Sequence, residues 1–204
     1  MTNSRPQRAF SLRRLLQHPL FWILLVALVL RMAAALVLGN TVRGLSGAQD
    51  EITYSMLGHR FVQGFGLTFP ENWYPWIKAN TEQAYFSDAS IYYLSAIYPL
   101  FGYQPLAARV VTGLISTASV GLIYLLGARL FGKTVGLVAA GIAAVYAYLI
   151  YYGVTLVTEP LFILALLVTM LITYSILDRP SLGKWLALGV TLALAVLLRM
   201  AVIF

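Results

Sequence analysis

Acidic residues gather in one polar stretch of an otherwise apolar chain. Five of the seven acidic residues fall between residues 40 and 104, namely Asp50, Glu51, Glu71, Glu82 and Asp88. A carboxylate within hydrogen-bond reach of a hydroxyl group can remove its proton while that hydroxyl attacks a substrate. The adjacent pair Asp50 and Glu51 is therefore a candidate for general-base chemistry.

Three arginines are candidates for binding an anion. Arg31 and Arg199 lie within apolar runs, and Arg109 lies at the beginning of another. An ionisable side chain at membrane depth costs at least about 2.5 to 3.5 kcal/mol, so it is normally paired, faces water or binds an anion. The planar guanidinium group suits a phosphate. A structural alternative is that these arginines reach the interface or pair with Glu159, which has the Thr-Glu-Pro setting of a helix start.

The elements that must position these groups are membrane helices. The chain is 60% hydrophobic and 10% charged, with a mean hydropathy of +0.82. Its apolar runs of about 17 to 25 residues match the length of a transmembrane helix. We therefore predict an all-α, polytopic transmembrane protein with about five spans and a long outer loop that carries surface helices.

The charge of the chain indicates topology and not nucleic-acid binding. The net charge is +7, but the basic residues lie mainly at the ends of apolar runs, where they orient the spans. The chain has no cysteine, which excludes disulfides and thiolate metal sites. Its two histidines, His18 and His59, are too far apart in sequence to favour a histidine-built metal site.

The positive-inside rule gives the order of the segments. Residues 1–18 are predicted to be a cytoplasmic basic tail, and residues 19–39 the first transmembrane helix. Residues 40–105 form an outer loop, and residues 106–204 contain transmembrane helices two to five. The third is expected at 135–152 and the fifth from about Trp185. This places four further basic residues inside: Arg129, Lys133, Arg179 and Lys184.

Two helices are predicted within the outer loop. Asp50 can begin one, because the apolar residues that follow have helical spacing and Gly64 and Gly66 can end it. Such a helix would lie on the bilayer surface. Residues 90–101 form the second, whose roughly 12 residues reach only about 18 Å and cannot cross a hydrocarbon core of about 30 Å. It is expected to be a re-entrant or surface helix.

In this topology the polar candidates converge on the outer membrane level. There the chain resembles the C-type-fold membrane glycosyltransferases that use polyprenyl-phosphate sugars. These are relatives of protein O-mannosyltransferases and of the aminoarabinose and galacturonic acid transferases that modify lipid A. The matching stretches follow the family's order: Asp50-Glu51 with Tyr54, Gly64-Phe65-Gly66, Tyr98-Pro99-Leu100-Phe101 before Arg109, Tyr124 to Gly132, Thr158-Glu159-Pro160, and Leu197-Leu198-Arg199.

The resemblance implies transfer of a sugar from a polyprenyl-phosphate donor to a glycan, lipid or protein acceptor on the outer face of the plasma (inner) membrane. Transfer would invert the sugar in one displacement, with Asp50 as the catalytic base. Glu51 and Glu159 would position the acceptor, and Arg109 and Arg199 would bind the lipid phosphate. Two further substrate-binding candidates are Arg31 and Tyr54. The sequence requires no cofactor or metal site. An alternative is that the enzyme uses a divalent cation and that His59 is one of its ligands.

Family members have many more spans, so the chain is expected to be the N-terminal part of a longer enzyme. Whether this part is active or inactive by itself stays open. It also departs from many relatives at residues 87–90, where they have a basic, proline-containing turn. Two other functions are a transporter or flippase of an anionic lipid-linked substrate and a non-catalytic scaffold. The carboxylates lie in a loop, and the sequence shows no pair of broken helices, which disfavours transport.

Overall fold

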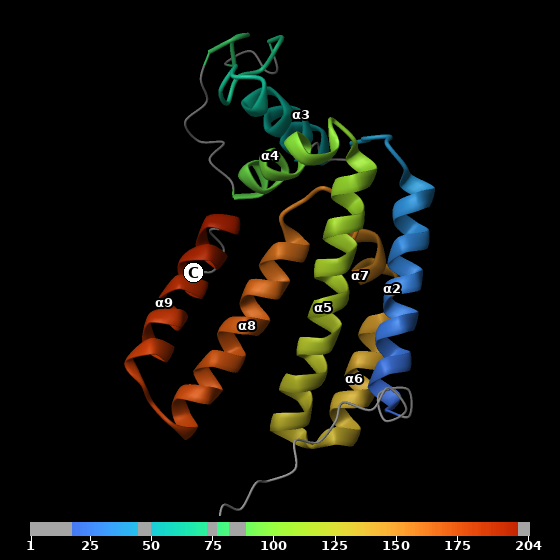
Figure 1. Cartoon of the computed structure of the whole chain (residues 1–204), viewed down its shortest axis with the longest axis vertical. Coiled ribbons are helices and arrows are strands. Elements are labelled where there is room, and N and C mark those ends of the chain that lie inside the picture. The colour runs from blue at the N-terminus through green and yellow to red at the C-terminus, as the bar shows by residue number, and fades with distance from the viewer. Residues whose placement is uncertain (1–17, 45–49, 73–76, 82–88, 200–204) are drawn as a thin grey trace, which may run out of the picture.

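The computed structural model describes residues 18–44, 50–72, 77–81 and 89–199. Within these residues the regular elements are helices: α2 (Pro19–Leu38), α3 (Asp50–Val62), α4 (Ala89–Phe101), α5 (Pro105–Phe131), α6 (Lys133–Val145), α7 (Ala147–Tyr152), α8 (Glu159–Asp178) and α9 (Leu182–Leu198). Figure 1 shows α2, α5, α6, α8 and α9 running along the long axis, with α3 and α4 across one end, here called the α3/α4 end. The predicted all-α membrane class is confirmed.

Local capping signals explain where the long helices begin and end. Proline occupies the first turn of α2, α5 and α8, where its missing N–H is not needed. Asn40 adds a cap to α5, because its Oδ1 accepts from the backbone N–H of Leu106 at 2.9 Å. Gly39 ends α2 and Gly132 ends α5, both with positive φ, 56° and 95°.

The two short helices pack on each other and cover the bundle end. Helix α3 ends at Val62 and is followed by Gly64 (φ 84°), where Phe65 N–H donates to Arg60 O and Gly64 N–H to Phe61 O, a Schellman motif. A Cβ atom at Gly58 would lie only 3.1 Å from Leu94 Cβ, so α3 and α4 approach closely there. With 13 residues each, both are too short to cross a hydrocarbon core.

Within the part of the chain that the structure describes, three helices, α2, α5 and α8, are long and apolar enough to cross a membrane. The expected third span is interrupted: α6 ends at Val145, Tyr146 has extended dihedrals (φ −68°, ψ 116°), and α7 follows. The fifth candidate, α9, begins at Leu182 and ends at Leu198, so Arg199 lies at the end of the helix and not within it.

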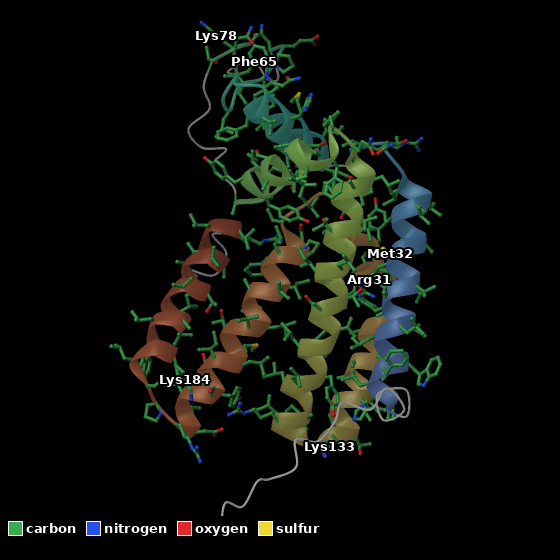
Figure 2. All side chains as sticks on the ribbon, viewed as in Figure 1. Arg31, Met32, Phe65, Lys78, Lys133 and Lys184 are labelled. Carbon is green, nitrogen blue, oxygen red and sulfur yellow. The ribbon has the colours of Figure 1, made fainter. Side chains whose placement is uncertain are left out.

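Basic residues mark the opposite end of the bundle, here called the basic end. Figure 2 labels Lys133 and Lys184 there, whereas Phe65 and Lys78 lie at the α3/α4 end. Arg129 forms an ion pair with Asp178, joining α5 to α8. Lys184 Nζ donates to Ser175 O at 2.7 Å and Arg179 O at 2.6 Å, which satisfies carbonyl groups at the end of α8.

Small residues allow α5 and α6 to pack tightly. A Cβ atom on Gly136 would lie 2.7 Å from both Ala128 N and Tyr124 O, which are backbone atoms of α5. Gly141, on the same helix, has nothing within 4 Å of the corresponding position. The close approach at Gly136 is what sets α6 against α5.

We therefore expect Gly136→Ala to destabilise the bundle by about 1 to 3 kcal/mol, because the backbones must separate. Gly141→Ala is the matched control and should be neutral or stabilising by up to about 1 kcal/mol, since alanine favours the helix. Unfolding of the purified protein in detergent measures both. Equal stability of the two variants would contradict the proposed packing.

Candidate functional site

A buried ion pair joins α3 to the bundle. Arg109, near the beginning of α5, and Glu51, in the first turn of α3, lie with Nη2 and Oε1 2.6 Å apart, and their side chains are 1% and 4% exposed. Both groups are buried, so little water screens their charges. The attraction between these groups is therefore mainly that of two opposite charges.

Arg109 also binds three backbone carbonyl groups from two separate segments. Its Nε donates to Gly39 O at 3.1 Å and its Nη2 to Thr41 O at 2.8 Å, both just after α2. Its Nη1 donates to Val154 O at 3.1 Å, in the turn before α8. The guanidinium group thus holds the end of α2, the 153–158 turn and α3 together.

The surroundings of Glu51 affect its charge. Burial raises the pKa of the Glu51 carboxyl, and this effect outweighs the lowering by Arg109 and by the backbone of Leu156. The ionised form of Glu51 therefore depends on Arg109. Asp50, the first residue of α3, is exposed.

Arg31 occupies the break between α6 and α7. Its Nε donates to Ser116 Oγ at 2.8 Å, and its Nη1 and Nη2 donate to Ala144 O and Ala143 O, each at 3.3 Å. A fourth bond runs to Ala27 O on its own helix, at 3.1 Å. Arg31 is 1% exposed, and Figure 2 shows it between α2 and α5.

A second ion pair lies where α8 begins and α9 ends. Arg199 Nη1 is 3.2 Å from Glu159 Oε1, and the side chains are 49% and 32% exposed. Glu159 also lines a cavity of about 50 Å³ between α5, α7 and α8, and Arg31 lies in the wall of the same cavity. The cavity wall is otherwise mainly apolar, with Val120, Leu149 and Ile163 among its residues.

A profile of the dolichyl-phosphate-mannose-protein mannosyltransferase family matches residues 89–204, more than half of the chain. The chain belongs to this family. No curated protein and no solved structure gives a significant match. The resemblance to protein O-mannosyltransferases is therefore confirmed at the level of the family.

Membership makes this mannosyltransferase-family chain a multi-pass membrane glycosyltransferase that draws on a polyprenyl-phosphate sugar. The matched segment extends from α4 to the end of the chain and contains Arg109, Glu159 and Arg199. It begins after α3, so the family match does not cover Asp50 and Glu51, whose roles stay predictions.

The structure brings the candidate residues of this mannosyltransferase-family chain together in two groups. One is Glu51 with Arg109, and Asp50 is adjacent in sequence. The other is Glu159 with Arg199, and Glu159 lines the same cavity as Arg31. Tyr54 is half-buried against the two apolar clusters that join α3 to its neighbours. Glu71 is exposed, and Glu82 and Asp88 lie outside the described residues.

Sequence reasoning missed a polar and aromatic cluster at the α3/α4 end. Ser55 Oγ lies 2.8 Å from the Tyr98 hydroxyl and 3.2 Å from the Tyr103 hydroxyl. The His59 ring stacks on Tyr103 with centroids 4.2 Å apart, and its Nε2 lies 2.9 Å from Gln63. No group of three acidic, histidine or cysteine side chains forms a metal cluster within the described residues. The helical spacing of Ser55 and His59 was the available signal.

The Arg109 contacts predict a strongly coupled pair. We expect Arg109→Met and Glu51→Gln each to destabilise the protein, Arg109→Met by about 3 to 5 kcal/mol because it leaves a buried charge and three carbonyl groups unpaired. The double variant should cost less than the sum, by about 0.5 to 3 kcal/mol.

Unfolding of the four proteins in detergent measures this coupling. Arg43→Met is the matched control, because Arg43 lies in the same loop region and is exposed. The interpretation fails if Arg109→Met is no less stable than Arg43→Met.

Proposed function

We propose that this chain carries the sugar-transfer site of its glycosyltransferase at the α3/α4 end, with Asp50 as the base. The observation that carries the proposal is the buried contact of Arg109 with Glu51, because it fixes the first turn of α3, and Asp50 with it, on the bundle. The Glu159–Arg199 pair lies at this same end.

The two adjacent carboxylates have different roles in the proposed reaction. Successive helical residues point about 100° apart, so Asp50 and Glu51 cannot face one site together. Glu51 is buried against Arg109, whereas Asp50 is exposed and can reach an acceptor hydroxyl. Asp50 is therefore the better base, and Glu51 a residue that positions it.

The three arginines also divide by accessibility. Arg31 and Arg109 are each 1% exposed and donate to oxygen atoms of the protein. Arg199 is 49% exposed, and its ion-pair partner Glu159 is a half-buried carboxylate. A lipid phosphate can therefore reach Arg199 without removing backbone contacts. We assign the leaving-group phosphate to Arg199, with Arg109 and Arg31 as its structural support.

The reaction proposed is a single displacement. The acceptor hydroxyl oxygen forms a bond to the anomeric carbon while its proton passes to the Asp50 carboxylate. The bond from the anomeric carbon to the phosphate oxygen breaks, and its electrons leave with the polyprenyl phosphate, whose charge Arg199 stabilises. In-line displacement inverts the anomeric carbon. The acceptor is a lipid, a protein or a wall polymer.

The distribution of basic residues supports an outward-facing site. Arg129, Lys133, Arg179 and Lys184 belong to the basic end, opposite α3 and α4. By the positive-inside rule the basic end is cytoplasmic, as is the tail of residues 1–18. We propose that the protein lies in the plasma membrane with the α3/α4 end outside.

One observation bears on a transporter instead. The break at Tyr146 resembles the interrupted helices on which transporters bind their substrates. The carbonyl groups of Ala143 and Ala144, however, accept from Arg31, so this break is filled by a side chain of the protein. The family match also favours a transferase.

Asp50→Asn should lower sugar transfer by about 10²- to 10⁴-fold, because the amide cannot accept the proton. Membranes that contain the protein are supplied with polyprenyl-phosphate sugar and an acceptor, and the product is counted. Glu71→Gln, the same change at an exposed acid, is the control and should retain activity. Normal transfer by Asp50→Asn would remove Asp50 as the base.

A further inference from the structure

We propose that Arg31 is a positioning residue for the transfer site, which it serves by holding the break between α6 and α7. This inference rests on the proposed function of the α3/α4 end. Arg31 itself touches no proposed substrate atom. It acts through the segment 146–158, which leads from the break to Glu159.

The break needs a partner for its carbonyl groups. A helix leaves its last four C=O groups without intrahelical donors, and lipid offers none in their place. Tyr146 N–H still reaches Ile142 O, but Ala143 O and Ala144 O receive their bonds from Arg31. A cation at this position also suits the negative end of the helix dipole. Arg31 therefore stabilises the broken form over a continuous helix.

The segment that follows the break is held at its other side by the second buried arginine. Arg109 Nη1 donates to Val154 O at 3.1 Å. Residues 153–158 are all buried, and a Cβ atom on Gly153 would lie 2.4 Å from Ser116 Oγ. Ser116 is also the acceptor for Arg31 Nε. The segment is thus fixed between two guanidinium groups, and Glu159 begins α8 directly after it.

The cavity shows what this segment positions. Leu149, Tyr152 and Gly153 form one wall, and Glu159 and Pro160 form another. A shift of α7 would move the first wall and the chain that enters α8. Since Glu159 binds Arg199, such a shift would displace Arg199, the residue proposed to bind the lipid phosphate.

The shape of the guanidinium group explains why arginine occupies this position. Three separate nitrogen atoms donate to Ser116 and to two carbonyl groups at fixed angles. The single ammonium of a lysine cannot reach all three acceptors. Arg31→Lys should therefore keep the charge and restore only part of the geometry.

The test compares Arg31→Met and Arg31→Lys with wild type in the full protein. Hydrogen–deuterium exchange of residues 143–158 should rise in Arg31→Met, rise less in Arg31→Lys, and stay unchanged in α8 beyond its first turn. The KM for polyprenyl-phosphate sugar should rise and transfer at low donor concentration fall by about 10- to 100-fold. Simple loss of folded protein would instead lower Vmax and leave the KM for the donor unchanged.

Arg129→Met is the matched control, because Arg129 also donates to a helix carbonyl, Tyr174 O, but at the basic end. It should change neither exchange in residues 143–158 nor the donor KM. If Arg31→Met does not fold, Ser116→Ala removes one acceptor and should give a smaller rise in the same segment.

Unchanged exchange at 143–158, an equal rise in all helices, or an unchanged donor KM would each overturn the proposal. The exchange measurement needs no substrate. If the wild-type protein transfers no sugar, the proposed function is wrong. Hydrogen–deuterium exchange still tests whether Arg31 holds the break.

Discussion

The buried guanidinium group of Arg109 is the contact on which the arrangement of this protein depends. Its side chain is 1% exposed, so water cannot replace the partners to which it donates. It joins the end of α2, the turn before α8 and the first turn of α3 through Gly39, Thr41, Val154 and Glu51. Removing one member of a buried pair leaves an uncompensated charge, which is far more costly than the loss of a surface ion pair. The buried residues of α3 include the polar Glu51, Thr53 and Ser55, so polar contacts hold this helix on the bundle together with apolar packing.

Arg31 makes the same kind of contact as Arg109, deeper in the bundle. In both cases a cation within an apolar protein satisfies backbone carbonyl groups that helical hydrogen bonding leaves free, at a break or at a turn. Arginines in membrane segments are often taken as anion-binding residues. Here two of the three support the backbone, and the accessible one, Arg199, lies at the end of α9 beside Glu159. The proposed division between supporting and substrate-binding arginines follows from this difference in exposure.

Local features could be predicted from the sequence, and features that depend on distant contacts could not. Pro19, Gly39, Pro105 and Gly132 set the ends of α2 and α5, and the length of the 90–101 segment argued against a span. The break at Tyr146 was missed because no proline or glycine marks it, and its stabilising residue, Arg31, lies more than 100 positions away in the chain. The sequence predicted Asp50 as the base and Glu51 as an acceptor-positioning residue, but it could not show that Glu51 is buried against Arg109, because that contact joins residues far apart in the chain.

Photolabelling with a polyprenyl phosphate that carries a diazirine beside its phosphate tests the central claim most directly, because it locates the lipid phosphate on the protein. If the α3/α4 end is the transfer site, the label should be found on peptides that contain the beginning of α8 or the end of α9, close to Glu159 and Arg199. Excess unlabelled polyprenyl phosphate should prevent this labelling. Labelling of the basic end instead, on peptides that contain Lys133 or Lys184, would contradict the account.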